Sequence, residues 1–281
     1  MTNILEAICN IVEQDNYDIR TIYAGRNRAN SMGEALEAYI KDAFANTLSE
    51  DNEEMRLERH AEKFSWLGSQ NNPPDIIIRG GDAIEVKKTE SPLANLPLNS
   101  SYPKADLRCD SPMIASACRD CEDWETKPLI YSVGHTQDTS LKSLWLIYGD
   151  IYAAKQETYE RIKTTISSGV GEISDVVFSE TRELGRVNQV DPLGITALRI
   201  RGMWHIENPR KVFDYLHHTD TTNTFELVSI VPLEKWNECC EESRERIERI
   251  NKLSFSIADA RIKNPNNPAN LIDVKLIKYC I

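Results

Sequence analysis

A β-hairpin predicted between residues 75 and 88 constrains the fold of this chain more than any other stretch. Two runs of β-branched and small apolar residues, 76–78 and 83–86, flank a turn signal at Gly80 and Gly81. Side chains alternate between the two faces along a strand. The register of the hairpin therefore decides which of its charged groups lie together.

Two registers of this hairpin are open. With a two-residue turn over the glycines, Asp75 pairs with Val86 and the acidic side chains fall on opposite faces. With a three-residue turn that also takes in Asp82, Asp75 pairs with Lys87. We favour the second register because it alone separates charged from apolar side chains. The charged face would carry Asp75, Glu85 and Lys87, and the apolar face Ile76, Ile78, Ile84 and Val86.

Two carboxylates and an ammonium on one strand face suit divalent-metal hydrolysis of a phosphodiester. Mg²⁺ takes oxygen ligands from one or two carboxylates and leaves its other positions to water and phosphate. Asp75 and Glu85 are the candidate metal ligands. Lys87 is the candidate catalytic cation, because an ammonium there can orient the attacking water or stabilise the transition state. The alternative is an ordinary hairpin with solvated charges.

An amphipathic helix is predicted over residues 32–48, with Ser31 as its N-cap. Its apolar side packs Leu36, Ile40, Ala43, Phe44 and Leu48. Glu34 and Glu37 lie near its start, and Glu37 flanks the apolar stripe. Either glutamate can be an ordinary solvated residue of the helix surface.

The remaining pattern predicts an α/β chain without repeats or long linkers. Further helices are expected over 2–15, 50–63, 112–124, 152–168 and 236–253, and further strands over 64–68, 129–134, 144–148 and 271–279. Residues 91–102 are proline-rich and aperiodic, so we expect a loop that leaves the charged strand. One domain over 1–281 is the simplest organisation.

Polar and basic side chains gather in three stretches outside the hairpin. Arginine forks read guanine edges, and small donors and cations contact phosphate and sugar oxygens. In each stretch a solvated surface is the competing interpretation. The candidate DNA contacts are Arg26, Arg28, Asn99, Ser100, Ser101, Lys104, Arg186, Asn188, Arg199, Arg201 and His205.

Composition excludes some classes of function. A formal charge of −11 argues against a non-specific DNA coat protein but leaves a local basic cleft possible. There is no membrane-length apolar run and no signal-peptide pattern at the start, so we expect a cytoplasmic protein. The seven cysteines should be reduced thiols, and the single CxxC at Cys118 and Cys121 has no partner motif for zinc.

Six segments together resemble type II restriction endonucleases of the NgoPII type, within the PD-(D/E)xK nucleases. The Asp75 to Lys87 spacing, with nine residues between the first acid and the Glu85-Val86-Lys87 element, resembles the PD-(D/E)xK motif itself. The segments are 25–37, 71–75, 81–88, 98–104, 191–195 and 201–209.

This resemblance implies a Mg²⁺-dependent homodimer that cuts both strands of double-stranded DNA at GGCC. It implies an αβββαβ core in a mixed sheet flanked by helices, which agrees with the predicted element order. The catalytic core would span about 31–170 and the recognition elements about 176–211. An early-helix glutamate often joins the metal site in a G-x-x-x-E setting. Gly33 and Glu37 match that setting, with Glu34 as the second choice.

Two other functions stay open at this stage. A repair or recombination nuclease of the same fold would recognise DNA structure rather than sequence. A DNA-binding protein without catalysis would use the hairpin charges only structurally.

Overall fold

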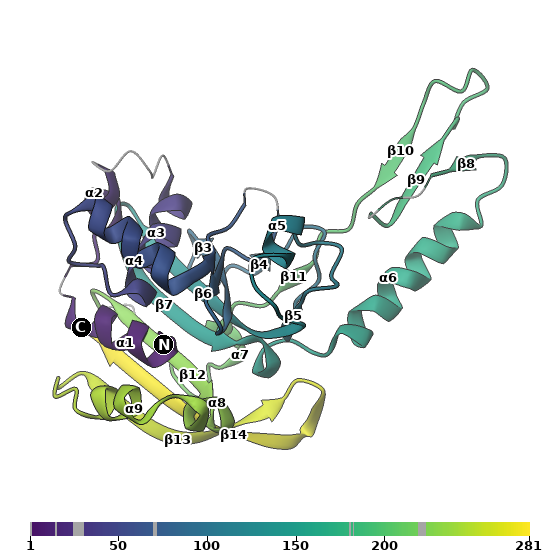
Figure 1. Cartoon of the computed structure of the whole chain (residues 1–281). Helices are drawn as coiled ribbons and strands as arrows, with labels where there is room; N and C mark the ends of the chain where they lie inside the picture. The colour runs from purple at the N-terminus through teal and green to yellow at the C-terminus, as the bar shows by residue number, and fades with distance from the viewer. Residues whose placement is uncertain are drawn as a thin grey trace.

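The computed structural model describes residues 2–14, 16–24, 31–69, 72–179, 181, 183–218 and 223–281. These residues form a mixed sheet flanked by helices, with a separate arm projecting from the body (Figure 1). None of the described helices is both long and apolar enough to span a bilayer.

The helical elements follow the chain in this order: α1 (Ile4–Glu13), α2 (Ile19–Ala24), α3 (Met32–Ala45), α4 (Glu53–Lys63), α5 (Ser116–Arg119), the 3₁₀ turn η1 (Gly149–Ile151), α6 (Gln156–Gly171), α7 (Pro209–Val212), α8 (Leu233–Glu238) and α9 (Glu241–Glu248). The strands are β1 (Phe64–Trp66), β2 (Ile76–Ile78), β3 (Ala83–Thr89), β4 (Leu96–Pro97), β5 (Asp106–Arg108), β6 (Thr126–Gln137), β7 (Ser140–Tyr148), β8 (Val177–Phe178), β9 (Gly185–Asn188), β10 (Leu198–Ile200), β11 (His205–Ile206), β12 (Glu226–Pro232), β13 (Phe255–Asn264) and β14 (Asn267–Cys280).

The main sheet has the strand order β1-β2-β3-β6-β7-β12-β14-β13, and β5 pairs with β6 at one side. β3 runs parallel to β6 and β7 runs parallel to β12, while the other pairs in this order are antiparallel. The predicted buried strands over 129–134 and 144–148 are confirmed as parts of β6 and β7.

The hairpin forms, but in neither of the two registers considered. Ile76 pairs with Ile84, and the turn closes through a hydrogen bond from the Ile78 amide to the Asp82 carbonyl (2.9 Å). Gly80 lies inside the turn with φ +66°, a conformation that favours glycine. The observed pairing is two residues away from the favoured register, and an even shift leaves every side chain on its predicted face.

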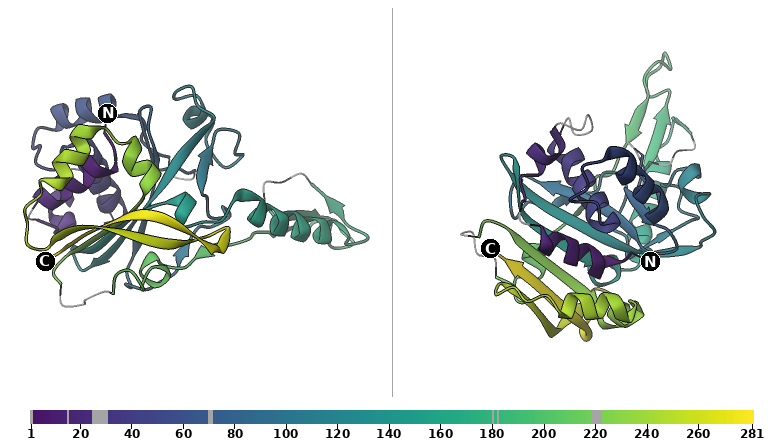
Figure 2. Two further views of the ribbon diagram at one scale, coloured as in Figure 1. Left: turned by 90° about the horizontal axis from the view of Figure 1, so that it is seen from below. Right: turned by 60° about the vertical axis from the view of Figure 1, so that its left-hand side comes forward.

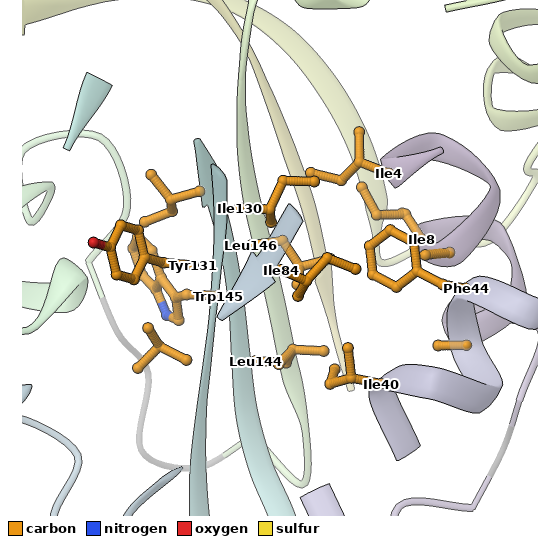
Figure 3. Close-up of a cluster of buried hydrophobic side chains, with 14 of the residues drawn as sticks. Ile4, Ile8, Ile40, Phe44, Ile84, Ile130, Tyr131, Leu144, Trp145 and Leu146 are labelled. Atoms are coloured by element: carbon orange, nitrogen blue, oxygen red, sulfur yellow. The ribbon is translucent and has the colours of Figure 1, made fainter. Parts of the chain in front are cut away.

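The core lies between the sheet and helices α1 and α3 (Figure 3). Ile4 and Ile8 of α1 and Phe44 of α3 approach Ile84 and Leu146 of the sheet (Figure 3). The predicted stripe of the first helix is therefore buried. A capping box between Ser31 and Glu34 starts α3, as the sequence predicts for Ser31.

A glycine in β6 lets α3 approach the sheet closely. A Cβ at Gly134 would lie 2.6 Å from the Leu36 Cδ2 atom. On the opposite face of the sheet, Tyr131 and Trp145 point away from α1 and α3 (Figure 3). Tyr131 packs edge-on against Tyr152 there (5.5 Å between ring centroids). This second face carries the charged side of the hairpin.

Three expected elements differ from the structure. The helix over 112–124 is reduced to α5, because Glu122 pairs with Lys127 and accepts a hydrogen bond from the Gly80 amide, which draws the segment to the sheet. The helix over 236–253 is divided into α8 and α9 by the extended backbone of Cys239. The loop over 91–102 contains β4, which pairs with β11.

The arm consists of α6 and a separate three-stranded sheet of β8, β9 and β10. Two views show it extending away from the body (Figures 1 and 2). No residue of α6 is buried. The arm therefore has little packing against the rest of this chain.

Candidate active site

The charged face of the hairpin opens into a cavity of about 320 Å³. Asp75, Glu85 and Lys87 line one side of it. The loop from Leu98 to Lys104 lines another part of it, and Tyr131 lies beside Glu85 on the neighbouring strand β6. The predicted gathering of the three motif residues on one face is thus present in the fold.

Asp75 is held through both its side chain and its backbone. Its Oδ2 atom accepts a hydrogen bond from the Val86 amide (2.6 Å). Gly68 lies against the Asp75 backbone, where a Cβ would be 2.7 Å from the Asp75 carbonyl oxygen, and Gly68 has φ +87°. Only glycine fits this contact without strain. The carboxylate is consequently fixed through one oxygen, which leaves Oδ1 for a ligand.

Glu85 and Lys87 form a pair within the cavity wall. The Lys87 ammonium donates to Glu85 Oε1 at 2.6 Å. Glu85 Oε2 is buried and has no hydrogen-bond partner among the described residues. A buried carboxylate oxygen without a partner is costly, and a bound cation would satisfy it.

Burial and a neighbouring like charge act together on Asp75. Burial, followed by the neighbouring Glu85 charge, raises the pKa of Asp75 to about 7. Burial lowers the pKa of Lys87, but the charges of Glu85, Asp75 and Glu37 outweigh it and raise this pKa above its usual value. Lys87 is therefore held in its charged form. The two carboxylates repel each other, and a divalent ion bound between them would relieve that repulsion.

Lys104 adds a second cation to the cavity. Its backbone amide donates to the Tyr131 hydroxyl (2.8 Å), and that hydroxyl donates to the Lys104 carbonyl (3.2 Å). Burial lowers the pKa of Lys104 to about 8. Gly149 permits this arrangement, since a Cβ there would lie 2.5 Å from the Lys104 carbonyl oxygen. Tyr131 was missed at the sequence level because its place in a buried strand gives no polar signal.

The two helix glutamates lie outside the cavity lining. Glu37 Oε1 accepts from the Lys41 ammonium at 2.6 Å, and its charge still acts on Asp75 and Lys87. Glu34 accepts a hydrogen bond from the Ser31 amide in the capping box. Of the four predicted metal ligands, the structure therefore brings Asp75 and Glu85 into the cavity and leaves Glu37 and Glu34 outside its lining.

A different cluster of potential metal ligands involves residues from the C-terminal part of the chain. Among the described residues, the ligand atoms of His217, Glu226 and Cys280 lie within 4.8 Å of one another. Glu226 is already paired with the Arg210 guanidinium (3.1 Å) and His217 (2.9 Å). That guanidinium compensates the carboxylate, so the cluster is a buried ion-pair network rather than a metal centre.

The predicted DNA contacts fall into two groups. Asn99, Ser100, Ser101 and Lys104 line the cavity beside the motif residues. Arg186, Asn188 and Arg199 lie on the arm's small sheet, and Arg201 and His205 follow it toward the body. Arg26 and Arg28 lie outside the described residues.

Two of these arginines share one carboxylate, that of Glu183. Arg199 Nη2 lies 2.8 Å from Glu183 Oε1, and Arg201 Nε lies 2.6 Å from the same oxygen. Arg186 pairs across the strands with Arg199. Arg199 and Arg201 are two residues apart, a spacing that puts side chains on one face of a strand, and their common partner is consistent with this.

Comparison with known proteins gives two matches and one negative result. The family model described as NgoPII restriction endonuclease matches residues 2–263. The type II restriction enzyme NgoPII of Neisseria gonorrhoeae is 45% identical over 278 residues, which cover 99% of each chain. No solved structure matches.

Proposed function

Because the chain belongs to the NgoPII restriction endonuclease family, we propose that it cuts both strands of DNA at GGCC with a Mg²⁺ site on Asp75 and Glu85. As a type II restriction enzyme it is a site-specific deoxyribonuclease, and double-stranded DNA is its partner. The observation that carries the metal site is the buried, unpartnered Glu85 Oε2 atom beside Asp75 and Lys87 in one cavity. We assign this cavity to a PD-(D/E)xK active site in a cytoplasmic enzyme.

The two carboxylates divide their oxygens between the protein and the ion. Asp75 uses Oδ2 for the Val86 amide, and Glu85 uses Oε1 for Lys87, which leaves one oxygen of each for Mg²⁺. The bound ion would supply a water of lowered pKa and neutralise charge that develops on the phosphate. Glu37 and Glu34 lie outside the lining of this cavity, so either glutamate would have to move toward it to add a further carboxylate.

Lys87 has the position of the catalytic cation. Its ammonium is anchored by Glu85 and lines the cavity, where it can donate to a phosphate oxygen or orient the attacking water. Across the cavity, Lys104, Asn99 and Ser100 offer a cation and small donors to the DNA backbone. These groups would fix the scissile phosphate between the two walls.

The arginines of the arm support sequence reading. Arg199 and Arg201 both pair with Glu183, and Arg186 lies opposite Arg199 on the small sheet. A GGCC half-site presents two guanines in the major groove. A guanidinium fork binds guanine O6 and N7 in a bidentate way. Base reading would require at least one arginine to exchange Glu183 for a guanine. Arg26, Arg28, Asn188 and His205 are further proposed contacts.

A homodimer is the assembly that fits a palindromic target, because two-fold symmetry of the DNA mirrors that of the protein. The tip of the arm supports this assembly. Leu193 and Ile195 are each 80% exposed there. Residues 189–198 contain one acidic residue, Asp191, and no basic residue. An apolar tip without cations suits a protein surface better than DNA phosphates, and we assign its partner as a second copy of the chain.

Mapping of DNA ends tests the proposed specificity. Purified protein, unmethylated plasmid and Mg²⁺ should give discrete cuts within GGCC, and EDTA should abolish them. Cuts at another fixed sequence would overturn the GGCC assignment and keep the metal site. Metal-dependent cuts confined to branches or mismatches would favour a repair nuclease of this fold. DNA binding without cleavage under any divalent metal would reduce the hairpin charges to a structural role.

A further inference from the structure

The loop that carries Lys104 is attached to both ends of the arm. At the returning end of the arm, the Leu98 amide donates to the Trp204 carbonyl (2.8 Å), and the Trp204 amide donates to the Asn99 carbonyl (2.9 Å). These bonds extend the β4–β11 ladder into the wall of the cavity. At the outgoing end, the Tyr102 hydroxyl donates to Glu160 Oε1 on α6 (3.1 Å).

Three aromatic rings fill the space where these ends meet. Tyr102 stacks on Tyr159 of α6 (5.5 Å between centroids, 14° between planes). Trp204 stands edge-on to both, at 6.2 Å from Tyr102 and 5.7 Å from Tyr159. We call Tyr102, Tyr159 and Trp204 the aromatic cluster. It joins the start of the arm, its end and the cavity loop in one packed unit.

Lys104 is a cavity cation that contacts this cluster. Its ammonium lies 5.7 Å from the centroid of the Tyr102 ring, within the range of a cation–π contact. The ammonium also contacts the Ser101 hydroxyl. The position of the ammonium therefore depends on where the Tyr102 ring lies, and that ring rests on the two ends of the arm.

We propose that Tyr102 is a positioning residue for Lys104, and that the aromatic cluster makes the placement of this ammonium depend on the arm. The inference rests on the proposed function, because it assigns Lys104 to the phosphate of bound DNA. It goes further by linking an arm with its own apolar surface to the geometry of the cavity. Movement of the arm on its partner would then move Lys104, while Asp75, Glu85 and Lys87 stay on the sheet.

A double-mutant cycle on the single-turnover cleavage rate tests this link. At saturating protein and Mg²⁺, Tyr102→Leu should lower the rate by about tenfold, because a misplaced cation loses transition-state stabilisation. In a Lys104→Ala background, the same change should cost less than about twofold, because residues that act as one unit are not additive. Tyr102→Phe, which keeps the ring, should restore most of the rate.

Trp204→Leu should reproduce the pattern of Tyr102→Leu from the other end of the arm. The matched control is Tyr215→Leu, since Tyr215 is an exposed tyrosine distant in sequence from the cavity loop. DNA affinity measured with Ca²⁺ in place of Mg²⁺ should change far less than the rate. If the effects of Tyr102→Leu and Lys104→Ala multiply, Tyr102 does not act through Lys104 and the proposal is wrong.

A second readout does not depend on cleavage. Amide hydrogen exchange over residues 98–104 should accelerate in Trp204→Leu and stay unchanged in Tyr215→Leu, because the Trp204 segment pairs with this loop. Unchanged exchange would overturn the link to the arm. Failure of the active-site assignment looks different: Lys87→Ala would still cut DNA, whereas the Tyr102–Lys104 coupling would remain measurable.

Discussion

At the scale of single residues, the charged groups that line the cavity destabilise the folded protein when no metal is bound. The charge of Glu85 helps to raise the pKa of Asp75. Glu85 Oε2 has no hydrogen-bond partner in the described part of the chain. The sequence could predict that these acids share a face with Lys87, although the predicted register of the hairpin differed from the observed one by two residues. An even shift preserves side-chain alternation, so the face was insensitive to that error.

Neutralising Asp75 should stabilise the metal-free protein at alkaline pH. An acid whose pKa rises to about 7 on folding binds more protons folded than unfolded between about pH 4 and 7, so its stability contribution falls as pH rises through that window. Asp75→Asn keeps an acceptor for the Val86 amide. Its free energy of unfolding at pH 8 should exceed that of the wild type by on the order of 2 kcal/mol.

Denaturant unfolding of both proteins at pH 5 and pH 8 checks this expectation. The gain should be clearly smaller at pH 5, where most of the wild-type carboxyl is already protonated. Added Mg²⁺ should stabilise the wild type more than the variant, since the ion binds the folded carboxylates. An equal gain at both pH values would contradict a raised pKa at Asp75.

At the scale of elements, the cavity is made by the approach of a loop to the end of a sheet. The pattern over 91–102 correctly indicated a mainly irregular segment beside the charged strand. It could not show that the residues that follow, Lys104 and Ala105, lie against Gly149 of η1. Such placement depends on long-range packing, for which local periodicity carries no signal. For the same reason, the strongly exposed β13 was missed, since its side chains show no buried stripe.

Replacing Gly149 should displace the cavity loop. A Cβ there would lie 2.4 Å from the Ala105 carbonyl oxygen and 2.5 Å from that of Lys104, which are backbone atoms that cannot rotate away. Gly149→Ala should lower the single-turnover cleavage rate by about tenfold or more and cost about 1–3 kcal/mol of stability. Gly169→Ala is the matched control, because its Cβ would meet nothing within 4 Å.

The control should cleave at the wild-type rate and unfold no more easily, since alanine favours the helix over glycine. Equal behaviour of the two variants would mean that the loop does not need its close approach to Gly149.

At the scale of the whole molecule, the projecting arm is the feature that the sequence could not predict. The pattern over 152–168 correctly indicated a helix, α6, but gave no sign that the helix would leave the body (Figure 1). A helix with no buried residue gains little from its own chain, since most helical stability in proteins comes from packing. We therefore expect the arm to be stabilised by packing against a partner.

Polar substitution of the arm tip should weaken the dimer. Leu193→Ser with Ile195→Ser removes two highly exposed apolar side chains without touching a described charge pair. Sedimentation at micromolar concentration should show a shift toward monomer. Leu253→Ser provides the control, because Leu253 is fully exposed on the body and should leave the assembly unchanged. Dimerisation that is indifferent to the tip would assign the interface to another surface.

Variants of two adjacent lysines in β3 test whether Asp75, Glu85 and Lys87 form the metal-dependent active site. Lys87 faces the cavity, whereas Lys88 lies on the opposite face and pairs with Glu90. The measurement is the single-turnover cleavage rate of a GGCC duplex in Mg²⁺ by Lys87→Ala and Lys88→Ala. We expect a loss of at least about 100-fold for Lys87→Ala with DNA affinity retained in Ca²⁺, and a near wild-type rate for Lys88→Ala. Equal rates for the two variants would contradict the assignment of this cavity as the active site.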